Sequence, residues 1–303
     1  MFSQGQLRYF VVVSEEGQIT RAARRLQLAQ PALSQAIAQL EAQLGVELFV
    51  RHPRGVTLTD AGAVFLVKAR AALAAEAETA QTAMALRRAA NATITVGFIG
   101  PPPAISVPAL FAAFRERNAH AEISFQDLPF PCGATSSWIA NVDIALLHQP
   151  TPERGVSMQP VRVEPRAVVL SRAHALAASS ELELADVLDE PFISYHPDVQ
   201  LAWAGFHSLD DHRGGPPTQL THNYALTSLQ MLGIMSAPPR AITTLPCLDA
   251  KLAQQVLPGI AAIPLRDAEP TKVSLVWRAD TCNPLVAELV EAARELSVNG
   301  NEL

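Results

Sequence analysis

The first ninety residues place apolar side chains three and four positions apart, the spacing of one face of a helix. Residues 3–16 are predicted to form the first helix. Ser3 and Gln6 have the spacing of a capping box at its start, and Gly17 is suited to end it. This segment therefore carries both a start and a stop signal.

Two further helices and a hairpin are predicted after the first helix. Thr20 is expected to cap a short second helix that turns its arginines outward. Pro31 falls in the first turn of the third helix, where its missing N–H costs little, and Gly45 can stop that helix in a left-handed conformation. Two short strands, residues 46–50 and 56–58, then flank a loop that contains two arginines.

A long helix without proline is predicted from Thr59, which can cap it, to about Arg88. An isolated helix that exposes alanine and leucine along one side is marginal in water. We interpret it as a dimerisation helix; the alternative is that it packs against the C-terminal domain of its own chain. The residues expected at the dimer contact are Val64, Phe65, Ala69, Ala72 and Leu73.

Beyond residue 91, short apolar runs alternate with amphipathic helical segments. Strands that alternate with helices are typical of an α/β fold with a mostly parallel, doubly wound sheet. Two such sets follow one another, and the chain ends with a strand and a helix. The expected fold is an N-terminal winged helix-turn-helix, a long linker helix and a C-terminal α/β domain.

Composition places the chain among globular proteins, since 49% of its 303 residues are hydrophobic and 17% are charged. No apolar run reaches the ~18 residues of a membrane-spanning helix, and the N-terminus has no secretory signal, so we expect a cytoplasmic protein. Cys132, Cys247 and Cys282 lie far apart, which excludes a disulfide scaffold and a CxxC metal site.

Charge is divided unevenly along the chain. Residues 1–90 hold ten Arg and Lys against seven Asp and Glu, whereas residues 91–303 hold 13 against 22. A basic N-terminal part joined to an acidic remainder indicates an anionic partner for the first part.

The predicted third helix carries short polar side chains on its outer face, among them Gln30, Ser34 and Gln35. Amide and hydroxyl groups of this kind can reach base edges in a major groove. Arg51 and Arg54 lie in the loop between the two strands, where they can contact phosphates or a minor groove. The pattern predicts a DNA-binding winged helix-turn-helix; the alternative is a helical subdomain with a solvated polar face.

Several short elements form a dense pattern between residues 6 and 62. They are Ala22-Ala23-x-x-Leu26, Gln30-Pro31-Ala32-Leu33-Ser34, Ile37-x-x-Leu40-Glu41, Leu44-Gly45, Leu48-Phe49-x-Arg51 and Leu58-Thr59-x-x-Gly62. This pattern is similar to the DNA-binding domain of LysR-type transcriptional regulators. The rest of the chain has the layout of that family, so the resemblance covers the whole length.

The resemblance implies a three-part regulator. Its parts are a DNA-binding domain over residues 1–58, a linker and dimerisation helix over 59–90, and a two-lobed effector-binding domain similar to periplasmic binding proteins over 91–303. It also implies a homodimer or homotetramer, a double-stranded DNA operator with inverted half-sites, and a small-molecule effector. Neither an enzymatic activity nor a cofactor, metal or membrane partner is implied.

The resemblance also assigns the residues that face DNA. They are Thr20, Arg21, Arg24, Gln30, Pro31, Ser34, Gln35, Ala38, Arg51 and Arg54. The chain departs from the family at Ala29, where a serine usually caps the recognition helix, and at Gln35, Ala38 and Gln39, where an arginine is often found. A recognition helix without positive charge implies more reliance on the hairpin and on the arginines of the second helix.

The effector is expected in the cleft between lobe I (91–162 and 268–303) and lobe II (163–267), beyond the ends of strands. The nominated residues are Pro101, Pro102, Pro103, Phe130, His148, Tyr195, His196, Trp203, Asn223, Thr243 and Thr244. Many family members hold a carboxylate with Ser or Thr where this chain has prolines, which remove N–H donors.

This lining is aromatic and lightly polar. We therefore expect an uncharged or weakly acidic effector with a ring, stacked near Trp203 or Phe130 and hydrogen-bonded to Thr244. The alternative is that the aromatic side chains belong to the core.

Other functions have weaker support in the sequence. A thiol-sensing regulator would use Cys132 or Cys247, but no neighbouring Lys or Arg lowers their pKa. His207, Asp211 and His212 are expected in a solvated Gly/Pro turn and not in a metal site. A solute-binding protein would have a signal peptide and no helix-turn-helix. No enzyme motif occurs in a suitable setting, so no enzyme is predicted.

Overall fold

The computed structural model describes residues 2–133, 135–148, 153–236 and 241–298. The chain separates into two compact units, residues 1–81 and 82–303, and the division falls inside one long helix. Among the described helices, none is both long and apolar enough to cross a membrane.

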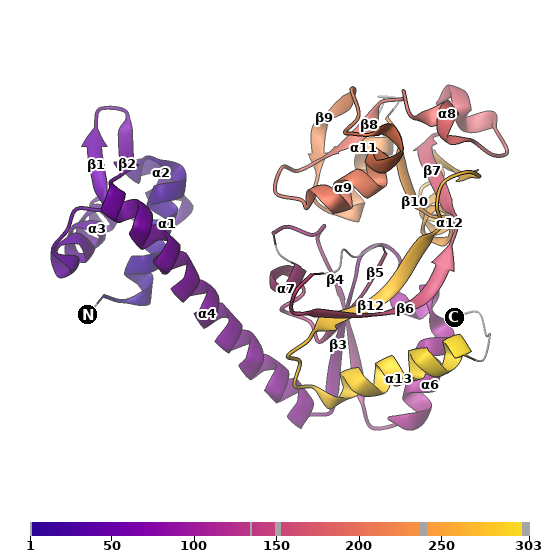
Figure 1. The fold of residues 1–303 in the computed structure, drawn as a ribbon, viewed down its shortest axis with the longest axis horizontal. Helices are drawn as coiled ribbons and strands as arrows, with labels where there is room; N and C mark the ends of the chain where they lie inside the picture. The colour runs from indigo at the N-terminus through magenta and orange to yellow at the C-terminus, as the bar shows by residue number, and fades with distance from the viewer. Residues whose placement is uncertain (1, 134, 149–152, 237–240, 299–303) are drawn as a thin grey trace. The chain divides into compact units, whose positions relative to one another are not determined.

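The first unit is a three-helix core with a two-stranded hairpin (Figure 1). Its elements are α1 (Gln4–Glu16), α2 (Ile19–Arg25), α3 (Gln30–Leu44), β1 (Phe49–His52), β2 (Gly55–Leu58) and the first part of α4 (Asp60–Ala90). Leu7, Phe10, Leu33, Ile37 and Leu40 are buried together between the helices. The 3.6-residue stripe of the sequence is therefore the core of this unit.

The boundaries of these helices follow their capping signals with one exception. Ser3 and Gln6 form the predicted capping box, and Gly45 is left-handed with φ of 71°. The prediction for Thr20 is wrong: the cap residue of α2 is Gln18, and Thr20 is an exposed residue of the first turn. The left-handed turn at Gly17 leaves Gln18 extended, so the helix starts earlier.

The hairpin is fixed to the helices by two local features. Glu41 of α3 accepts backbone N–H groups of Leu48 and Phe49 at 2.8 and 3.1 Å, so its carboxylate holds the start of β1. Gly62 lies so close to the Leu48 carbonyl that a Cβ there would be 2.1 Å from the oxygen. Only glycine allows α4 to pass the hairpin at this distance.

The second unit contains a five-stranded sheet in the order β4-β3-β5-β12-β6. The strands are β3 (Thr93–Phe98), β4 (Glu122–Asp127), β5 (Ile144–His148), β6 (Val156–Glu164) and β12 (Thr271–Arg278). β3 pairs in parallel with β4 and β5, whereas β12 runs antiparallel to β5 and β6. We refer to this sheet and its helices as lobe I.

Two helices cover one face of the lobe I sheet, α6 (Pro108–Arg117) and α13 (Pro284–Val298) (Figure 1). In β5, Ile144 and Leu146 pack toward these helices, while Ala145 and Leu147 join a second cluster on the opposite side. The shorter helices of lobe I are α5 (Pro103–Ser106) and α7 (Thr135–Trp138).

Lobe II is built from two small sheets. β7 (Arg166–Ser171) is flanked by β10 (Thr243–Pro246) and β11 (Ile260–Leu265), both antiparallel to it, and β8 (Phe192–Tyr195) pairs in parallel with β9 (Leu220–Ala225). Its helices are η1 (Ala175–Ala178), α8 (Leu184–Val187), α9 (Leu201–Ser208), α10 (Asp210–Arg213), α11 (Ser228–Ser236) and α12 (Cys247–Val256).

The expectation of a mostly parallel sheet is wrong for this unit. The strands that pass between the lobes, β6 into β7 and β11 into β12, pair antiparallel with their neighbours. A strand that returns from the other lobe enters the sheet from the opposite end, so antiparallel pairs accompany each crossing. The pattern of apolar runs in the sequence does not reveal whether neighbouring strands run parallel or antiparallel.

A buried ion pair ties the end of α4 to lobe I. Arg88 Nε and Nη2 donate to the two carboxylate oxygens of Asp143 at 2.8 and 3.0 Å. Asp143 also accepts the backbone N–H of Thr95 at 2.8 Å, and its side chain is fully buried. The last turns of α4 therefore belong to the second unit.

Candidate functional site: an interlobe cavity and an exposed helix-turn-helix face

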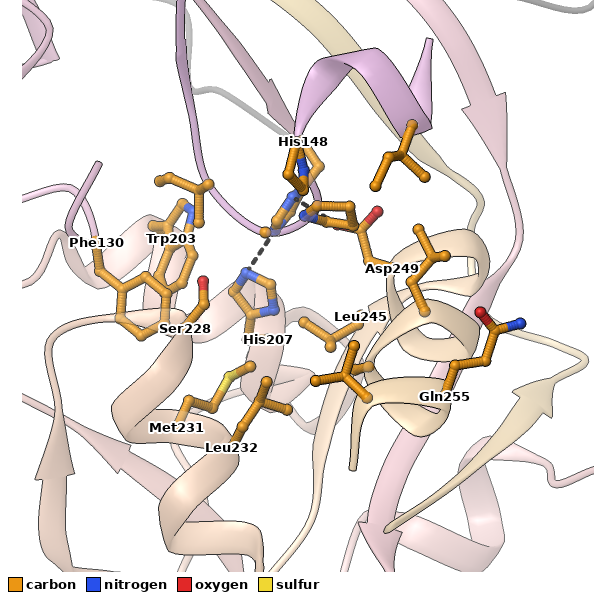
Figure 2. A pocket seen from close by; sticks show the side chains of 18 residues that line it. Phe130, His148, Trp203, His207, Ser228, Met231, Leu232, Leu245, Asp249 and Gln255 are labelled. Carbon is orange, nitrogen blue, oxygen red and sulfur yellow. Dashed lines mark hydrogen bonds and ion pairs between the residues drawn. The ribbon is translucent and has the colours of Figure 1, made fainter. Parts of the chain in front are cut away.

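A cavity of about 380 Å³ lies between the two lobes of the second unit (Figure 2). Lobe I contributes the segment after β3, Phe130 and the end of β5, and lobe II contributes α9, α11, β10 and α12. The lining residues are Ile99, Gly100, Pro101, Pro102, Ile105, Phe130, His148, Trp203, His207, Ser228, Met231, Leu232, Leu245, Asp249, Leu252, Ala253, Gln255 and Val256. The surface is mostly apolar, as in many small-molecule sites.

Aromatic rings form one wall of this cavity. The rings of Phe130 and Trp203 lie with centroids 4.3 Å apart, and Trp203 lies 4.1 Å from the His207 ring. Tyr195, which does not line the cavity, packs edge to face against Trp203 with ring centroids 5.3 Å apart. The wall is thus a packed cluster that presents Phe130 and Trp203 to the cavity.

Two buried histidines form a polar line along the cavity. His207 Nδ1 lies 2.6 Å from the Thr244 carbonyl, and its Nε2 lies 3.0 Å from His148 Nε2 (Figure 2). A carbonyl only accepts, so His207 Nδ1 carries the proton and donates it. In neutral His207 the Nε2 atom is then an acceptor, and His148 Nε2 is the donor.

Burial keeps these groups uncharged. Desolvation, with the nearby Arg166 charge, lowers the pKa of His148 to about 4. Desolvation, with His148 and Arg166 nearby, also lowers the pKa of His207 well below its ordinary value. Desolvation and the nearby Glu164 raise the pKa of Asp249 to about 8, although Arg162 opposes the shift. At neutral pH the cavity therefore presents neutral imidazoles and a mostly protonated carboxyl group.

Arg166 lies near the two histidines but does not line the cavity. Arg166 donates to the Phe206 carbonyl and to the Thr244 hydroxyl, and its guanidinium stacks 4.0 Å from the Phe206 ring. Burial lowers its pKa to about 10. None of the described lining residues is a lysine or an arginine.

The structure gathers five of the eleven nominated effector residues at the cavity. These are Pro101, Pro102, Phe130, His148 and Trp203. The other six do not line it: Pro103, Tyr195, His196, Asn223, Thr243 and Thr244.

The hydroxyl groups nominated in β10 already have partners in the protein. Thr244 donates to the His207 carbonyl at 3.0 Å and accepts from Arg166, and the Thr243 hydroxyl lies 2.9 Å from the Tyr195 hydroxyl. Asn223 is exposed on β9. The Thr244 hydroxyl is therefore already used within the protein and is not free for the expected hydrogen bond to an effector.

Thirteen of the 18 lining residues were not nominated from the sequence, among them His207 and Asp249. His207 is fully buried in α9 and not in a solvated turn, so that expectation is wrong for His207. Asp249 lies in the first turn of α12. For His207, the available signal was the apolar character of the segment 201–206, which indicates a buried helix.

The thiol groups of Cys132 and Cys247 have raised pKa values. Desolvation raises the pKa of both Cys132 and Cys247, with Asp198 and Glu164 adding to the respective shifts. The expectation that no basic residue lowers these pKa values is wrong for Cys247, because Lys251 partly opposes its shift. A raised pKa reduces the thiolate fraction that reacts with oxidants. This electrostatic setting disfavours the alternative of a thiol sensor.

The polar face of the first unit is open to solvent. The DNA-facing residues of the sequence analysis are exposed, except Ser34, which is half-buried and accepts the Gln30 amide at 2.9 Å. Arg21 and Arg25 of α2 are paired with Glu15 or Glu16. No ion pair joins Arg24, Arg51 or Arg54 to any residue in the described part of the chain.

The residues of α4 nominated for dimerisation differ in their burial. Ala69 is buried in the core of the first unit, and Phe65 and Leu73 are half-buried against the same core. Val64 and Ala72 are exposed, and the neighbouring Val67 is 66% exposed. The uncovered apolar stripe of this helix thus includes Val64 and Val67.

Two family models match the chain and together span nearly all of it. Residues 5–63 match "Bacterial regulatory helix-turn-helix protein, lysR family", and residues 87–297 match "LysR substrate binding domain". The chain belongs to the LysR family of bacterial transcriptional regulators. It is a DNA-binding regulator with an effector-binding domain, which confirms the fold class and function predicted from the sequence.

Relatives of this LysR-type regulator cover most of its length. The HTH-type transcriptional regulator AlsR of Bacillus subtilis is 31% identical over 290 residues, covering 94% of this chain and 93% of AlsR. The uncharacterized HTH-type transcriptional regulator YnfL of Escherichia coli is 30% identical and covers 84% of this chain and 81% of its own. The crystal structure of full-length BenM shares the fold, with a TM-score of 0.52, 24% identity and coverage of 100% and 99% of the two chains.

Proposed function

We propose that this LysR-type regulator binds, as a homodimer or homotetramer in the cytoplasm, an operator with inverted half-sites. Residues 1–58 contact DNA, α4 pairs the subunits, and residues 91–303 bind the effector. Two helix-turn-helix units related by a two-fold axis match a sequence that is repeated in inverted order. The observation that carries the proposal is the exposed face of α3 beside an uncompensated basic hairpin.

The two parts of that face have different roles. The Gln30, Gln35 and Ala38 side chains of α3 are exposed and uncharged, so they suit contacts with base edges. Arg51 lies in β1 and Arg54 in the turn of the hairpin, both without an acidic partner in the described structure, so they suit phosphates. Arg21 and Arg25 already pair with acidic residues and contribute less net charge to the contact.

Substitutions in the hairpin and in α3 separate these roles. Arg51→Ala and Arg54→Ala should each weaken binding to all sequences alike and reduce the slope of log affinity against log salt by about 1. Gln35→Ala should change the preference among operator variants by about tenfold at the contacted base pair. Fluorescence anisotropy with a panel of duplexes at several salt concentrations measures both.

The matched control is Arg172→Ala, an arginine of lobe II that bonds to the Pro258 carbonyl and has no place on the DNA-facing surface. A change of sequence preference in the hairpin variants with none in Gln35→Ala would reverse the assigned docking.

We also propose that the effector is an uncharged or weakly acidic molecule with a ring, bound in the interlobe cavity. Three observations support this class. The lining carries Phe130 and Trp203, it has no lysine or arginine among the described residues, and the start of α5 has prolines where N–H donors would hold a carboxylate. Thermal-shift screening of the full-length protein against neutral and carboxylated ring compounds tests it.

A further inference from the structure

Asp249 carries a carboxyl group that forms no hydrogen bond to the described part of the protein. Its side chain is nine-tenths buried and lines the cavity. No hydrogen bond joins this carboxyl to any residue in the described structure, and its nearest polar neighbour is His148 Nδ1, 3.9 Å from Oδ2. A carboxyl group that lines a cavity and forms no hydrogen bond to the protein is free to bond to a molecule bound there.

His148 Nδ1, the polar atom nearest to the Asp249 carboxyl, can act only as a hydrogen-bond acceptor. His148 donates its Nε2 proton to His207, because His207 Nδ1 is committed to the Thr244 carbonyl. Neutral His148 therefore holds a bare lone pair on Nδ1, which can only accept. His148 is 95% buried and also lines the cavity.

We propose that His148 Nδ1 and the Asp249 carboxyl form a subsite that binds one hydroxyl group of the effector. This inference rests on the proposed interlobe effector cavity and names the polar group that the effector carries. The hydroxyl donates its proton to His148 Nδ1 and accepts the proton of Asp249. The attached ring lies in the apolar part of the cavity beside Trp203 and Phe130.

The distance between the two atoms suits a single bridging oxygen. Two hydrogen bonds of about 2.8 Å can meet at one atom placed between groups 3.9 Å apart. A hydroxyl oxygen is able to donate and accept at the same time, as this pair requires. Gly100 leaves room beside Oδ2, since a Cβ at that position would stand 3.0 Å from it.

Two other ligand groups fit the pair less well. A carboxylate can accept from Asp249 but has no proton for His148, and no lysine or arginine of the described lining offsets its charge. An ammonium group can donate to both atoms, but it requires Asp249 to ionise in a site that holds its proton at neutral pH. The hydroxyl meets both atoms without any change of charge.

The charged groups around the pair set the pH at which it changes. Asp249 of α12 faces Glu164 and Arg162 of β6 and His148 of β5, while His148 also faces His207 of α9 and Arg166 of β7. When Asp249 loses its proton above about pH 8, it no longer donates a hydrogen bond to the hydroxyl. The single hydroxyl proton can then be donated either to the carboxylate or to His148, so one of the two hydrogen bonds is lost. Its affinity should then fall.

Four small probes test the subsite on the full-length protein by isothermal titration calorimetry. They are benzyl alcohol, toluene, benzylamine and benzoate, which share a ring and differ in the polar group. At pH 7 benzyl alcohol should bind about tenfold more tightly than toluene, because it adds two hydrogen bonds. Benzoate and benzylamine should bind more weakly than benzyl alcohol. Between pH 7 and 9 the affinity for benzyl alcohol should fall severalfold.

Two variants and one control locate the effect. In His148→Phe, benzyl alcohol should bind no better than toluene, while toluene still binds. In Asp249→Asn, the fall with pH should disappear, because an amide does not titrate. Asp127→Asn removes an exposed carboxyl of β4 outside the cavity and should leave all four affinities and the pH dependence unchanged.

Distinct outcomes overturn the subsite and the cavity. If toluene and benzyl alcohol bind with equal affinity, and neither variant changes these affinities, the cavity binds rings without the help of His148 and Asp249. The subsite would then be wrong, while the proposed effector cavity would stand. Tighter binding of benzylamine than of benzyl alcohol at pH 7 would make the pair a cation site. Absence of binding by all four probes would overturn the cavity as an effector site.

Discussion

Buried titratable side chains set the chemistry of the cavity at the scale of single residues. His148 and His207 stay neutral because burial disfavours the imidazolium, so they oppose folding only as the pH falls below about 6.5, where the unfolded chain binds their protons. Asp249 behaves in the opposite sense, since burial makes it keep a proton that the unfolded chain loses near pH 4. The three groups therefore contribute a pH dependence of stability that originates in the cavity.

The substitution Asp249→Asn should reveal this linkage. Between about pH 4 and pH 8 the folded wild-type protein holds one more proton at residue 249 than the unfolded chain does. Its stability should therefore fall, relative to that of the variant, by about 1.4 kcal/mol per pH unit in this window and stay level above pH 8. Urea unfolding of both proteins at pH 5, 6, 7, 8 and 9, followed by far-UV circular dichroism, measures the difference. A constant difference would show that Asp249 ionises normally.

The sequence could nominate only part of this site. Phe130 and His148 follow apolar runs, so their place at the ends of strands was predictable, and Trp203 lies just beyond β8. The contact between His148 and His207 joins residues 59 positions apart, and no periodicity records it. Thr243 and Thr244 were nominated by their strand, but tertiary hydrogen bonds to Tyr195, Arg166 and His207 occupy their hydroxyl groups.

At the scale of elements, α4 has two unlike faces within the first unit. Phe65, Ala69 and Leu73, four residues apart, pack on the helix-turn-helix core, whereas Val64 and Val67 stay exposed by 69% and 66%. The helical period predicted that this helix has an apolar stripe. It could not divide the stripe between the unit's own core and a second subunit, because both contacts use the same residue types.

The exposed pair of valines gives a direct test of subunit pairing through α4. The double substitution Val64→Asp and Val67→Asp adds repelling charges to that contact without touching the core, so the full-length protein should sediment as a monomer. Operator affinity should fall by about a hundredfold or more, since two half-sites are no longer bound together. Leu201→Asp, at an 86% exposed leucine of lobe II, serves as the control. A dimer in the double variant would place the subunit contact elsewhere.

At the scale of the whole molecule, the regulator joins a DNA-binding unit to a separate unit that contains the interlobe cavity. An effector can shift operator binding only by its different affinity for two states of the protein. The cavity draws its lining from both lobes, so a bound molecule contacts both at once. Residues at the cavity should therefore alter the response to effector and leave basal operator binding intact.

A charge at the rim of the cavity tests this separation. Val256 lines the cavity and is 75% exposed, so Val256→Glu should fold normally but weaken the response to an apolar effector at least tenfold. Leu229→Glu, on α11 and outside the lining, is 79% exposed and should respond as the wild type does. Operator affinity measured with and without the effector decides between them. An unaltered response in Val256→Glu would place the effector elsewhere.

The ion pair between Arg88 and Asp143 decides where the molecule can be cut. A fragment that starts at residue 91 loses Arg88 and leaves a fully buried carboxylate with only the Thr95 N–H, at a cost of about 3–5 kcal/mol. A fragment that starts at residue 82 keeps the pair and should melt at a clearly higher temperature in calorimetry. The gene can therefore be divided for recombinant work, or joined to a foreign DNA-binding module, only upstream of the last turns of α4.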